Sequence, residues 1–288
     1  MGLERLTGVA AALTLVCSSP IRAQTQPGVT FDQNIISVRD NGSATVTDSA
    51  IVHVTATARN IRLDVKGDIP DMKGMPGGEN VVMLIANGGS TMTFVLTGEK
   101  EYMTFNPLQM MEKAEKLMAG IGVRMTLDTA LSKVTFDSLG PGPMIDGHPT
   151  LRYRITSRMR MSMSIMDSNT VMDQQSIEDM NTTLDYPDMR DVTQSLNKFG
   201  ELFSNSFGFM RDYLDQVLKA HDRVRGFPLR VTKQETKTAG GATQKSADTM
   251  HITNIRRVSV PDGTFAIPAD YEQVSIPLPA TADTTSRQ

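Results

Sequence analysis

The chain has 288 residues, a formal net charge of −3 at pH 7, a single cysteine, no tryptophan and 20 methionines. A mildly acidic chain without a clustered basic excess argues against a nucleic-acid partner. One cysteine excludes an intramolecular disulfide and a thiolate metal site, and the length fits one large domain or two small ones.

The first residues have the pattern of an export signal. A charged start containing Arg5 precedes an apolar stretch over residues 6–16, and a polar region ends at Ala23. An apolar stretch of about eleven residues is too short to cross a bilayer, which takes about twenty. We therefore expect a signal peptide over residues 1–23, cleavage after Ala23, and a periplasmic or secreted protein with no transmembrane segment in the mature chain. Lipid attachment at Cys17 is the disfavoured alternative, because Val16 stands where lipoprotein signals place a small residue.

Residues 29–105 predict a meander of antiparallel strands. Apolar residues fall on even positions up to Ala58 and on odd positions from Ile61, so a bulge or tight turn is expected near Asn60. Asn87-Gly88-Gly89 is typical of a hairpin turn. Strands are expected over residues 29–38, 52–58, 61–65, 81–85, 91–96 and 101–105.

Asn106 followed by Pro107 indicates the start of a helix, because the amide side chain can cap it and proline tolerates the first helical position. Leu108, Met111 and Met118 share one helical face, so a short helix is predicted over about residues 107–119. Strands are expected to resume over 123–127 and 133–136.

Period-two alternation is clearest over residues 151–165. The apolar positions are Leu151, Tyr153, Ile155, Met159, Met161, Met163 and Ile165. Between them stand Arg152, Arg154, Arg158 and Arg160. This pattern predicts one strand with a methionine-rich face and an arginine-rich face that is exposed to water. At roughly 3.3 Å per residue the strand would run about 50 Å, a length that suits a large curved antiparallel sheet.

The C-terminal half combines helix and strand patterns. Residues 168–191 are ambiguous, with a strand over 176–184 as one interpretation. Apolar residues then step by three and four from Val192 to His221, which predicts an amphipathic helix of up to about thirty residues with candidate breaks at Gly200 and Gly208. Further along, the sequence predicts two strands over 227–235 and 250–260, a polar loop over 237–248 between them, and a disordered tail over 277–288.

A methionine face beneath a long helix suggests a ligand cavity. If the sheet curves and the helix covers it only partly, the gap can hold an acyl chain, which gains about 0.8 kcal/mol per methylene removed from water. Methionine is flexible and polarisable, so it adapts to variable partners. The candidate cavity residues are Leu151, Tyr153, Ile155, Met159, Met161, Met163, Ile165, Phe199, Phe203, Phe207 and Met210. The partner expected is therefore a lipid or another hydrophobic small molecule.

Two other interpretations stay open. If helix and sheet meet everywhere, the methionine face is an ordinary core, and the chain is a structural or interaction protein with a cell-envelope partner. Met159-x-Met161-x-Met163 also resembles a thioether site for Cu(I), as in a copper chaperone. No nucleophile elbow, phosphate-binding loop, dinucleotide motif or zinc-type histidine spacing occurs, so we expect no enzymatic activity, no cofactor and no zinc site.

The end of the sequence shows a family resemblance. The order of elements, the turn Met144-Ile145-Asp146-Gly147 and the closing Phe265-x-Ile267-Pro268-x-x-Tyr271 resemble a group of secreted, methionine-rich bacterial domains of unknown function. That group is similar in plan to the periplasmic lipoprotein-carrier superfamily of LolA, LolB and LppX-like proteins. The resemblance covers about residues 29–275.

The resemblance implies an α+β fold, a half-open antiparallel barrel whose concave face is covered by a short helix and one long helix. It also implies a single domain over residues 24–276 and an apolar cavity for acyl chains. Many members of the group have a cysteine after the turn glycine, whereas this chain continues as Gly147-His148-Pro149-Thr150, so their disulfide is missing. No functional residue can be transferred from the resemblance.

Overall fold

The computed structural model describes residues 25–40, 42–67, 80–165, 168–189 and 208–275. Their frame is one sheet of thirteen strands, antiparallel except for the short last strand, and its two ends do not pair with each other. The strands are β1 (Thr25–Asp40), β2 (Thr45–Thr57), β3 (Ile61–Gly67), β4 (Asn80–Ala86), β5 (Thr91–Leu96), β6 (Glu101–Phe105), β7 (Val123–Leu127), β8 (Lys133–Pro141), β9 (Leu151–Ile165), β10 (Ser168–Thr183), β11 (Phe227–Ala239), β12 (Ala242–Pro261) and β13 (Glu272–Gln273).

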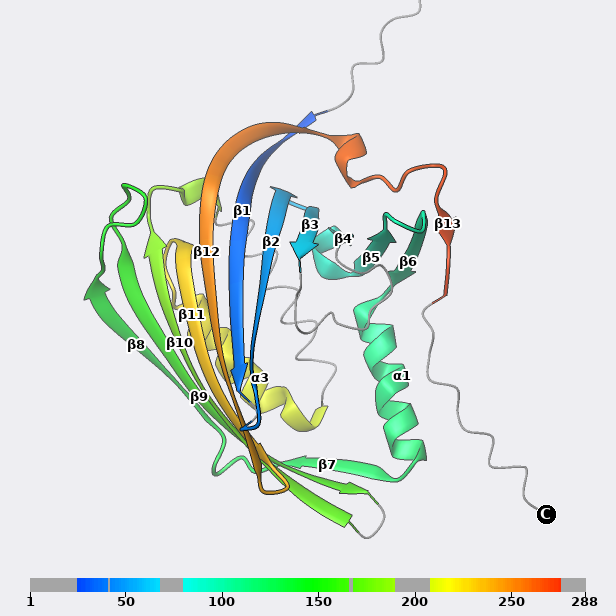
Figure 1. Cartoon of the computed structure of the whole chain (residues 1–288), viewed down its shortest axis with the longest axis vertical. Coiled ribbons are helices and arrows are strands. Elements are labelled where there is room, and N and C mark those ends of the chain that lie inside the picture. Colours follow the sequence, from blue (N-terminus) through cyan, green and yellow to red (C-terminus); the bar gives the residue numbers. More distant parts are fainter. Residues whose placement is uncertain (1–24, 41, 68–79, 166–167, 190–207, 276–288) are drawn as a thin grey trace, which may run out of the picture.

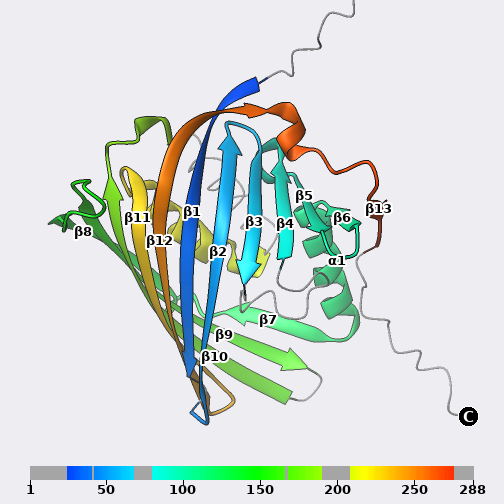
Figure 2. The same ribbon diagram turned by 45° about the horizontal axis from the view of Figure 1, so that its top comes forward.

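The sheet curves strongly, and both α-helices lie on its concave side (Figures 1 and 2). The strand order is β13-β6-β5-β4-β3-β2-β1-β12-β11-β10-β9-β7, and β8 pairs with the first half of β9 while β7 pairs with the second. The helices are α1 (Pro107–Gly120) and α3 (Arg211–Asp222), and single 3₁₀ turns occur at η2 (Asn87–Gly89), η3 (Pro187–Met189), η4 (Gly208–Met210) and η5 (Asp262–Phe265). Neither α-helix combines the length and the hydropathy that a bilayer crossing requires, within the residues described.

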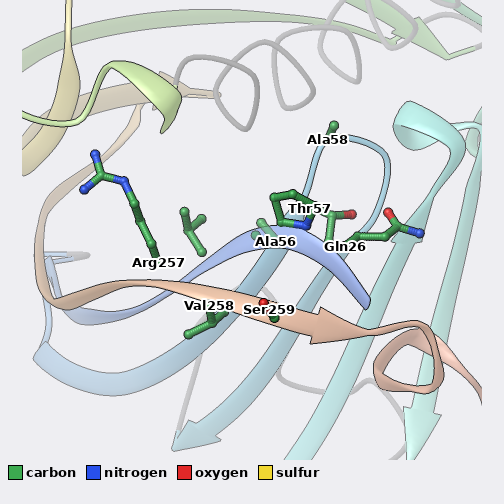
Figure 3. Close-up of a pocket in the computed structure, with 10 residues that line it drawn as sticks. Gln26, Ala56, Thr57, Ala58, Arg257, Val258 and Ser259 are labelled. Atoms are coloured by element: carbon green, nitrogen blue, oxygen red, sulfur yellow. The ribbon is translucent and has the colours of Figure 1, made fainter. Parts of the chain in front are cut away.

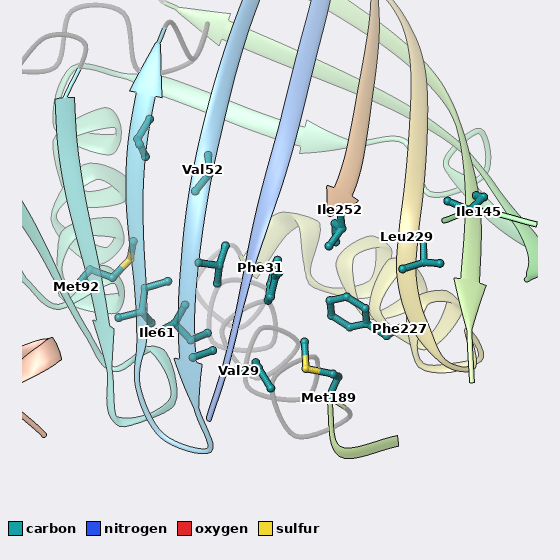
Figure 4. Close-up of a cluster of buried hydrophobic side chains, with 14 residues drawn as sticks. Val29, Phe31, Val52, Ile61, Met92, Ile145, Met189, Phe227, Leu229 and Ile252 are labelled. Carbon is teal, nitrogen blue, oxygen red and sulfur yellow. The ribbon is translucent and has the colours of Figure 1, made fainter. Parts of the chain in front are cut away.

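The largest apolar cluster covers the concave face of the central strands (Figure 4). Phe31 of β1 and Phe227 of β11 meet edge to face, with ring centroids 5.4 Å apart. Ile145, from the turn before β9, and Met189 of η3 add side chains from outside the sheet. This main core therefore ties β1–β5 and β11–β12 to the connections that pack on them.

The closing motif packs on the opposite, convex face of the sheet. Ile267 and Tyr271 contact a buried cluster of Val82, Leu84 and Val95. These positions alternate with Val81 and Ile85, which face the concave side. The closing motif therefore covers the outside of β4–β6, which is a structural role.

Most elements predicted from the sequence are confirmed. The 151–165 strand is β9, and the short helix is α1, where the Asn106 side chain accepts a hydrogen bond from the Gln109 backbone N–H at 3.2 Å. The phase change near Asn60 is a tight turn, in which the Thr57 N–H donates to the Asn60 carbonyl at 2.9 Å. The ambiguous stretch after β9 is mostly strand, because β10 reaches Thr183.

The prediction of one long helix is wrong. The described helix before β11 is α3, with 12 residues, and η4 stands immediately before it. Glycine has a poor helix propensity, and Met210 at the N-cap has φ −109° and ψ −1°, which interrupts regular helical geometry at Gly208–Met210. The earlier part of the predicted helix, residues 192–207, lies outside the described residues, as do the predicted signal peptide and C-terminal tail.

The prediction of a polar loop over residues 237–248 is also wrong. Strand β11 continues to Ala239, and strand β12 begins at Ala242. Gly240 and Gly241 make the turn between the two strands, with φ angles of +57° and +85°. Two successive positive φ angles suit a two-residue hairpin, and glycine adopts them without steric cost. The polar residues of this stretch therefore belong to a paired hairpin.

Candidate functional site

The register of the sheet gathers methionines at one end of the concave face. Met161 of β9 lies opposite Met172 of β10 and opposite Leu127 of β7, and Met163 lies opposite Met125. Residues directly opposite on neighbouring strands project from the same face. We call these five residues, all half-buried, the methionine patch. Of its members, only the two on β9 were candidate cavity residues, and the sequence placed Met172 no closer than the neighbourhood of the methionine motif on β9.

The first half of β9, the half that pairs with β8, is covered by helix α3. Tyr153 and Ile155 are buried in a cluster with Met180 and Ala220, against which Leu151 packs. Phe136 of β8 stacks on Tyr153 with ring centroids 5.7 Å apart, and the Arg223 guanidinium lies 4.2 Å from the Phe136 ring centroid. The structure therefore places the first three candidate cavity residues in packed surroundings rather than beside the methionine patch.

The remaining candidate residues lie in different environments. Met159 is buried next to the patch, whereas Ile165 at the end of β9 is 40% exposed. Met210 is half-buried on η4, which contacts β7. Phe199, Phe203 and Phe207 lie outside the described residues. Among the described candidate residues, those that come together in the second half of β9 are thus its three methionines.

A charged band crosses the concave face between the main core and the methionine patch. Strands β2, β1, β12, β11 and β10 each contribute one residue to a row across the concave face. Each of them contributes another residue to the next row. The first row is Asp48, Ser37, Asp248, Lys233 and Glu178, and the second is Val46, Arg39, Ser246, Glu235 and Ser176. Apolar side chains lie on one side of these rows. On the other side the strands continue with the polar residues Gln174, Lys237 and Gln244, and Met172 follows Gln174 on the same face of β10.

The polar groups of the charged band bind one another. Arg39 forms an ion pair with Asp48, and the Ser37 hydroxyl donates to Asp248. The Lys233 ammonium lies 2.9 Å from Glu235. Burial alone would lower the pKa of Lys233, but the hydrogen bond with Glu235 and the nearby carboxylates outweigh it and raise that pKa above its ordinary value. The charged band is therefore a paired network, and Lys233 keeps its charge.

Helix α3 reaches the charged band through a histidine. The His221 ring nitrogen Nε2 lies 3.5 Å from the Glu178 carboxylate. Ala220, the preceding residue, packs in the cluster with Tyr153. The end of α3 thus lies over the border between the packed half of β9 and the charged band.

Two more histidines hold the turn before β9 in place. His148 Nδ1 lies 2.7 Å from Asp185, and its Nε2 lies 3.0 Å from the Tyr186 hydroxyl. His251 on β12 pairs with Asp146 of the same turn at 2.9 Å. Because Ile145 of this turn enters the main core, the two pairs fix a packing element.

The convex face of β9 and β10 carries arginine–aspartate pairs. Arg154 donates from two nitrogens to the two oxygens of Asp179, each at 2.7 Å. Arg158 donates to the two oxygens of Asp173 in the same way, at 3.3 and 2.7 Å. The hydrogen bond from Arg154 holds the pKa of Asp179 below its ordinary value, with partial burial opposing it. The predicted arginine face is therefore confirmed as the outer face, where cross-strand carboxylates neutralise part of its charge.

The pair of Arg154 and Asp179 predicts that the free energy of unfolding depends on pH. Because the pKa of Asp179 is lower in the folded state than the unfolded value of about 3.9, its contribution is present above about pH 4 and is lost as the pH falls through the folded pKa. Urea midpoints measured from pH 6 to pH 2 should fall less steeply for Asp179→Asn than for the wild type. Glu99→Gln, in the exposed turn between β5 and β6, is the control for loss of a carboxylate. Equal slopes for Asp179→Asn and the wild type would contradict the assignment.

Two pockets open elsewhere in the described part of the protein. One, of about 610 Å³, lies beside the ends of β1, β2 and β12 and is lined by residues 26–29, 56–58 and 257–259 (Figure 3). The other, of about 480 Å³, lies between β6, α1 and residues 273–275. Both volumes fall in the range of small-molecule sites, about 300–1,000 Å³. Neither pocket is lined by a candidate cavity residue.

Oxygen, nitrogen and thiolate ligands do not gather into a metal site within the described residues. No group of three or more histidine, cysteine, aspartate or glutamate side chains is placed to hold an ion there. Each histidine instead pairs with one carboxylate, as His53 does with Asp32 at 2.7 Å.

No family model matches the chain, and no curated protein matches it. Among solved structures, PNGF-II is 10% identical with a TM-score of 0.25; the match covers 85% of this chain, which spans only 31% of that protein. A domain described as an outer membrane lipoprotein-sorting protein domain from Vibrio parahaemolyticus is 7% identical with a TM-score of 0.25, and the match covers 83% of this chain and 89% of that one. Both are distant neighbours of a chain whose frame is a large, open antiparallel sheet.

Proposed function

We propose that the protein is a non-enzymatic binding protein that holds a lipid or another hydrophobic ligand against the methionine patch. It would act in the periplasm or outside the cell, as a single domain over residues 24–276. The observation that supports this proposal most directly is the separation of the methionine patch from the main core by the charged band.

The separation matters because a core is normally one contiguous cluster. Main-core residues such as Phe31 and Ile252 are 2% exposed, and their neighbours on the concave face are also apolar. The methionine patch lies beyond two rows of polar and charged side chains, and its members are half-buried. An apolar surface in that position does not close the main core, which leaves it available to a ligand.

The chemistry of the methionine patch suits an acyl chain. Each methylene that leaves water contributes about 0.8 kcal/mol, and four or five methylenes on the patch would contribute about 3–4 kcal/mol. Thioether side chains adapt to the shape of an alkyl chain. The charged band gives the patch a polar border, and such borders orient ligands in mostly apolar sites.

The alternative function, a structural or interaction protein with a filled core, is supported by the first half of β9. There Tyr153 and Ile155 already pack fully against α3 and β8. The two functions differ in what they expect of the methionine patch, so the experiment is directed at the patch.

The test compares lysine substitutions on the two faces of the same strands. Met161→Lys with Met172→Lys places two ammonium groups in the methionine patch, whereas Val171→Lys with Ile177→Lys places them on the convex face of β10. Loss of contact with two or three methylenes costs about 2 kcal/mol, so the patch variant should bind a fluorescent fatty acid at least tenfold more weakly. The convex-face variant should bind like the wild type.

Native mass spectrometry of protein purified from the cell envelope provides the second measurement. The expected result is an additional mass that solvent extraction removes and that the patch variant lacks. A wild-type protein with a clean apo mass and no uptake of the fluorescent fatty acid would rule out the proposed function and leave the structural alternative.

A further inference from the structure

Four thioethers stand next to one another in the methionine patch. Met161 and Met172 face each other across β9 and β10, and Met163 and Met125 face each other across β9 and β7. Met161 and Met163 are also neighbours along β9, two residues apart on the same face. The four side chains therefore form a staggered line over three adjacent strands, in the order Met172, Met161, Met163 and Met125.

We propose that Met125, Met161, Met163 and Met172 form a thioether site for monovalent copper. Soft thioether sulfur selects Cu(I) over the harder divalent ions, which take carboxylate, carbonyl and water ligands. Carboxylates are not part of this staggered line, whose described neighbours across the strands are Leu127 and Thr170. The donor set is thus neutral and soft, as a low-charge, soft cation requires.

The spacing allows the sulfur atoms to converge. Directly opposite residues have Cβ atoms about 4.5–5.5 Å apart, and residues two apart along a strand lie about 6.6 Å apart. Methionine has three rotatable side-chain bonds, so the central Met161 and Met163 can bind one ion together with either outer sulfur, that of Met172 or that of Met125. The outer two residues are two strand spacings apart, so they alternate as the third ligand. The half-buried side chains leave the ion a route from solvent.

Two other methionines of the concave face lack this arrangement. Met180 is 5% exposed among Tyr153, Ile155 and Ala220, and Met189 is 1% exposed in the main core. Each is enclosed by carbon side chains, which is what a methionine that only fills space shows. Patch methionines differ from these in exposure and in standing next to one another in the strand register, so filling space does not account for their placement.

The test measures transfer of Cu(I) from bicinchoninate, a coloured chelator, to the purified protein without oxygen and without lipid. Wild-type protein should remove one equivalent of Cu(I). A variant with leucine at all four positions keeps the apolar character and volume of the patch, and it should bind Cu(I) at least tenfold more weakly. Because no lipid is present, the outcome does not depend on the proposed function.

The control replaces four methionines outside the patch by leucine, two of them with similar exposure and two of them more exposed. Met83 and Met250 are half-buried, and Met110 and Met144 are exposed. This control variant should keep wild-type Cu(I) binding, and far-ultraviolet circular dichroism should show that both variants are folded.

Nuclear magnetic resonance on protein with ¹³C-labelled methionine methyl groups identifies the ligands directly. One equivalent of Cu(I) should shift four methyl signals, which the variant with leucine at the four patch positions lacks, and should leave Met180 and Met189 unmoved. No transfer from the chelator, equal weakening in the control variant, or shifts confined to other methionines would each overturn the proposal.

Discussion

Replacing Phe227 by alanine should lower the free energy of unfolding by about 3–5 kcal/mol. The side chain is 4% exposed at the start of β11, and its ring meets Phe31 edge to face at 5.4 Å and Tyr186 at 6.2 Å. Alanine would leave a cavity between β1, β11 and the segment after β10. A loss of this size is a large part of the 5–15 kcal/mol that stabilises a typical domain.

Urea unfolding followed by circular dichroism measures the loss. Ile177→Ala is the matched control, because Ile177 is 39% exposed on the convex face of β10. Surface substitutions of this kind usually change stability by no more than about 0.5 kcal/mol. If Phe227→Ala unfolded at the same urea concentration as Ile177→Ala, the main core would not depend on the aromatic contacts between β1 and β11.

Local signals were enough to predict several elements. Alternation through most of β9 admits only an extended strand, because a helix would scatter the apolar residues from 151 to 165 around its axis. Asn106 and Pro107 determine the start of α1 through their own side chains, without help from the rest of the fold. Such features are readable because their cause lies within a few residues.

The length of the helix before β11 could not be predicted in the same way. Steps of three and four residues indicate which face of a helix is apolar, but they do not say where the helix begins. The 3₁₀ turn at Gly208–Met210 ends that regularity at Gly208, one of the two glycines that the sequence offered as candidate breaks.

The methionine patch and the charged band depend on register, which joins residues far apart in the sequence. Met125 became a neighbour of Met163 only through the pairing of β7 with β9. Met172 was closer to being found, because a short connection after Ile165 makes β10 return beside β9 and places Met172 opposite Met161. That inference required residues 168–183 to be assigned as a strand.

The charged band also explains why the β11–β12 hairpin was mistaken for a loop. Inward positions near its turn hold Lys233, Glu235 and Asp248 instead of apolar residues. Without apolar residues on alternate positions, the sequence shows no period of two, although the backbone is fully paired. Strand prediction therefore failed where the concave face changes from a core to a polar surface.

Gly226→Ala should lower the free energy of unfolding by about 3 kcal/mol or more. Gly226 precedes Phe227 with φ of +86°, a conformation that costs an L-residue about 1–2 kcal/mol. A Cβ atom there would also collide with the carbonyl of Thr183, which is fully buried and pairs with Phe227. Because the obstacle is backbone, β10 and β11 would have to separate where the main core begins, and strain of this kind adds about 1–3 kcal/mol.

Two other glycines separate the cost of the positive φ angle from the cost of the collision with Thr183 in urea unfolding. Gly122 has φ of +75° with no atom within 4 Å of a built Cβ, so Gly122→Ala should show the conformational cost alone. Gly263 has open space and no positive φ, so Gly263→Ala should be close to neutral. The expected order of destabilisation is Gly226→Ala, then Gly122→Ala, then Gly263→Ala. Equal losses at Gly226 and Gly122 would mean that β10 and β11 can move apart freely, and the β10–β11 contact would then not hold the concave face in shape.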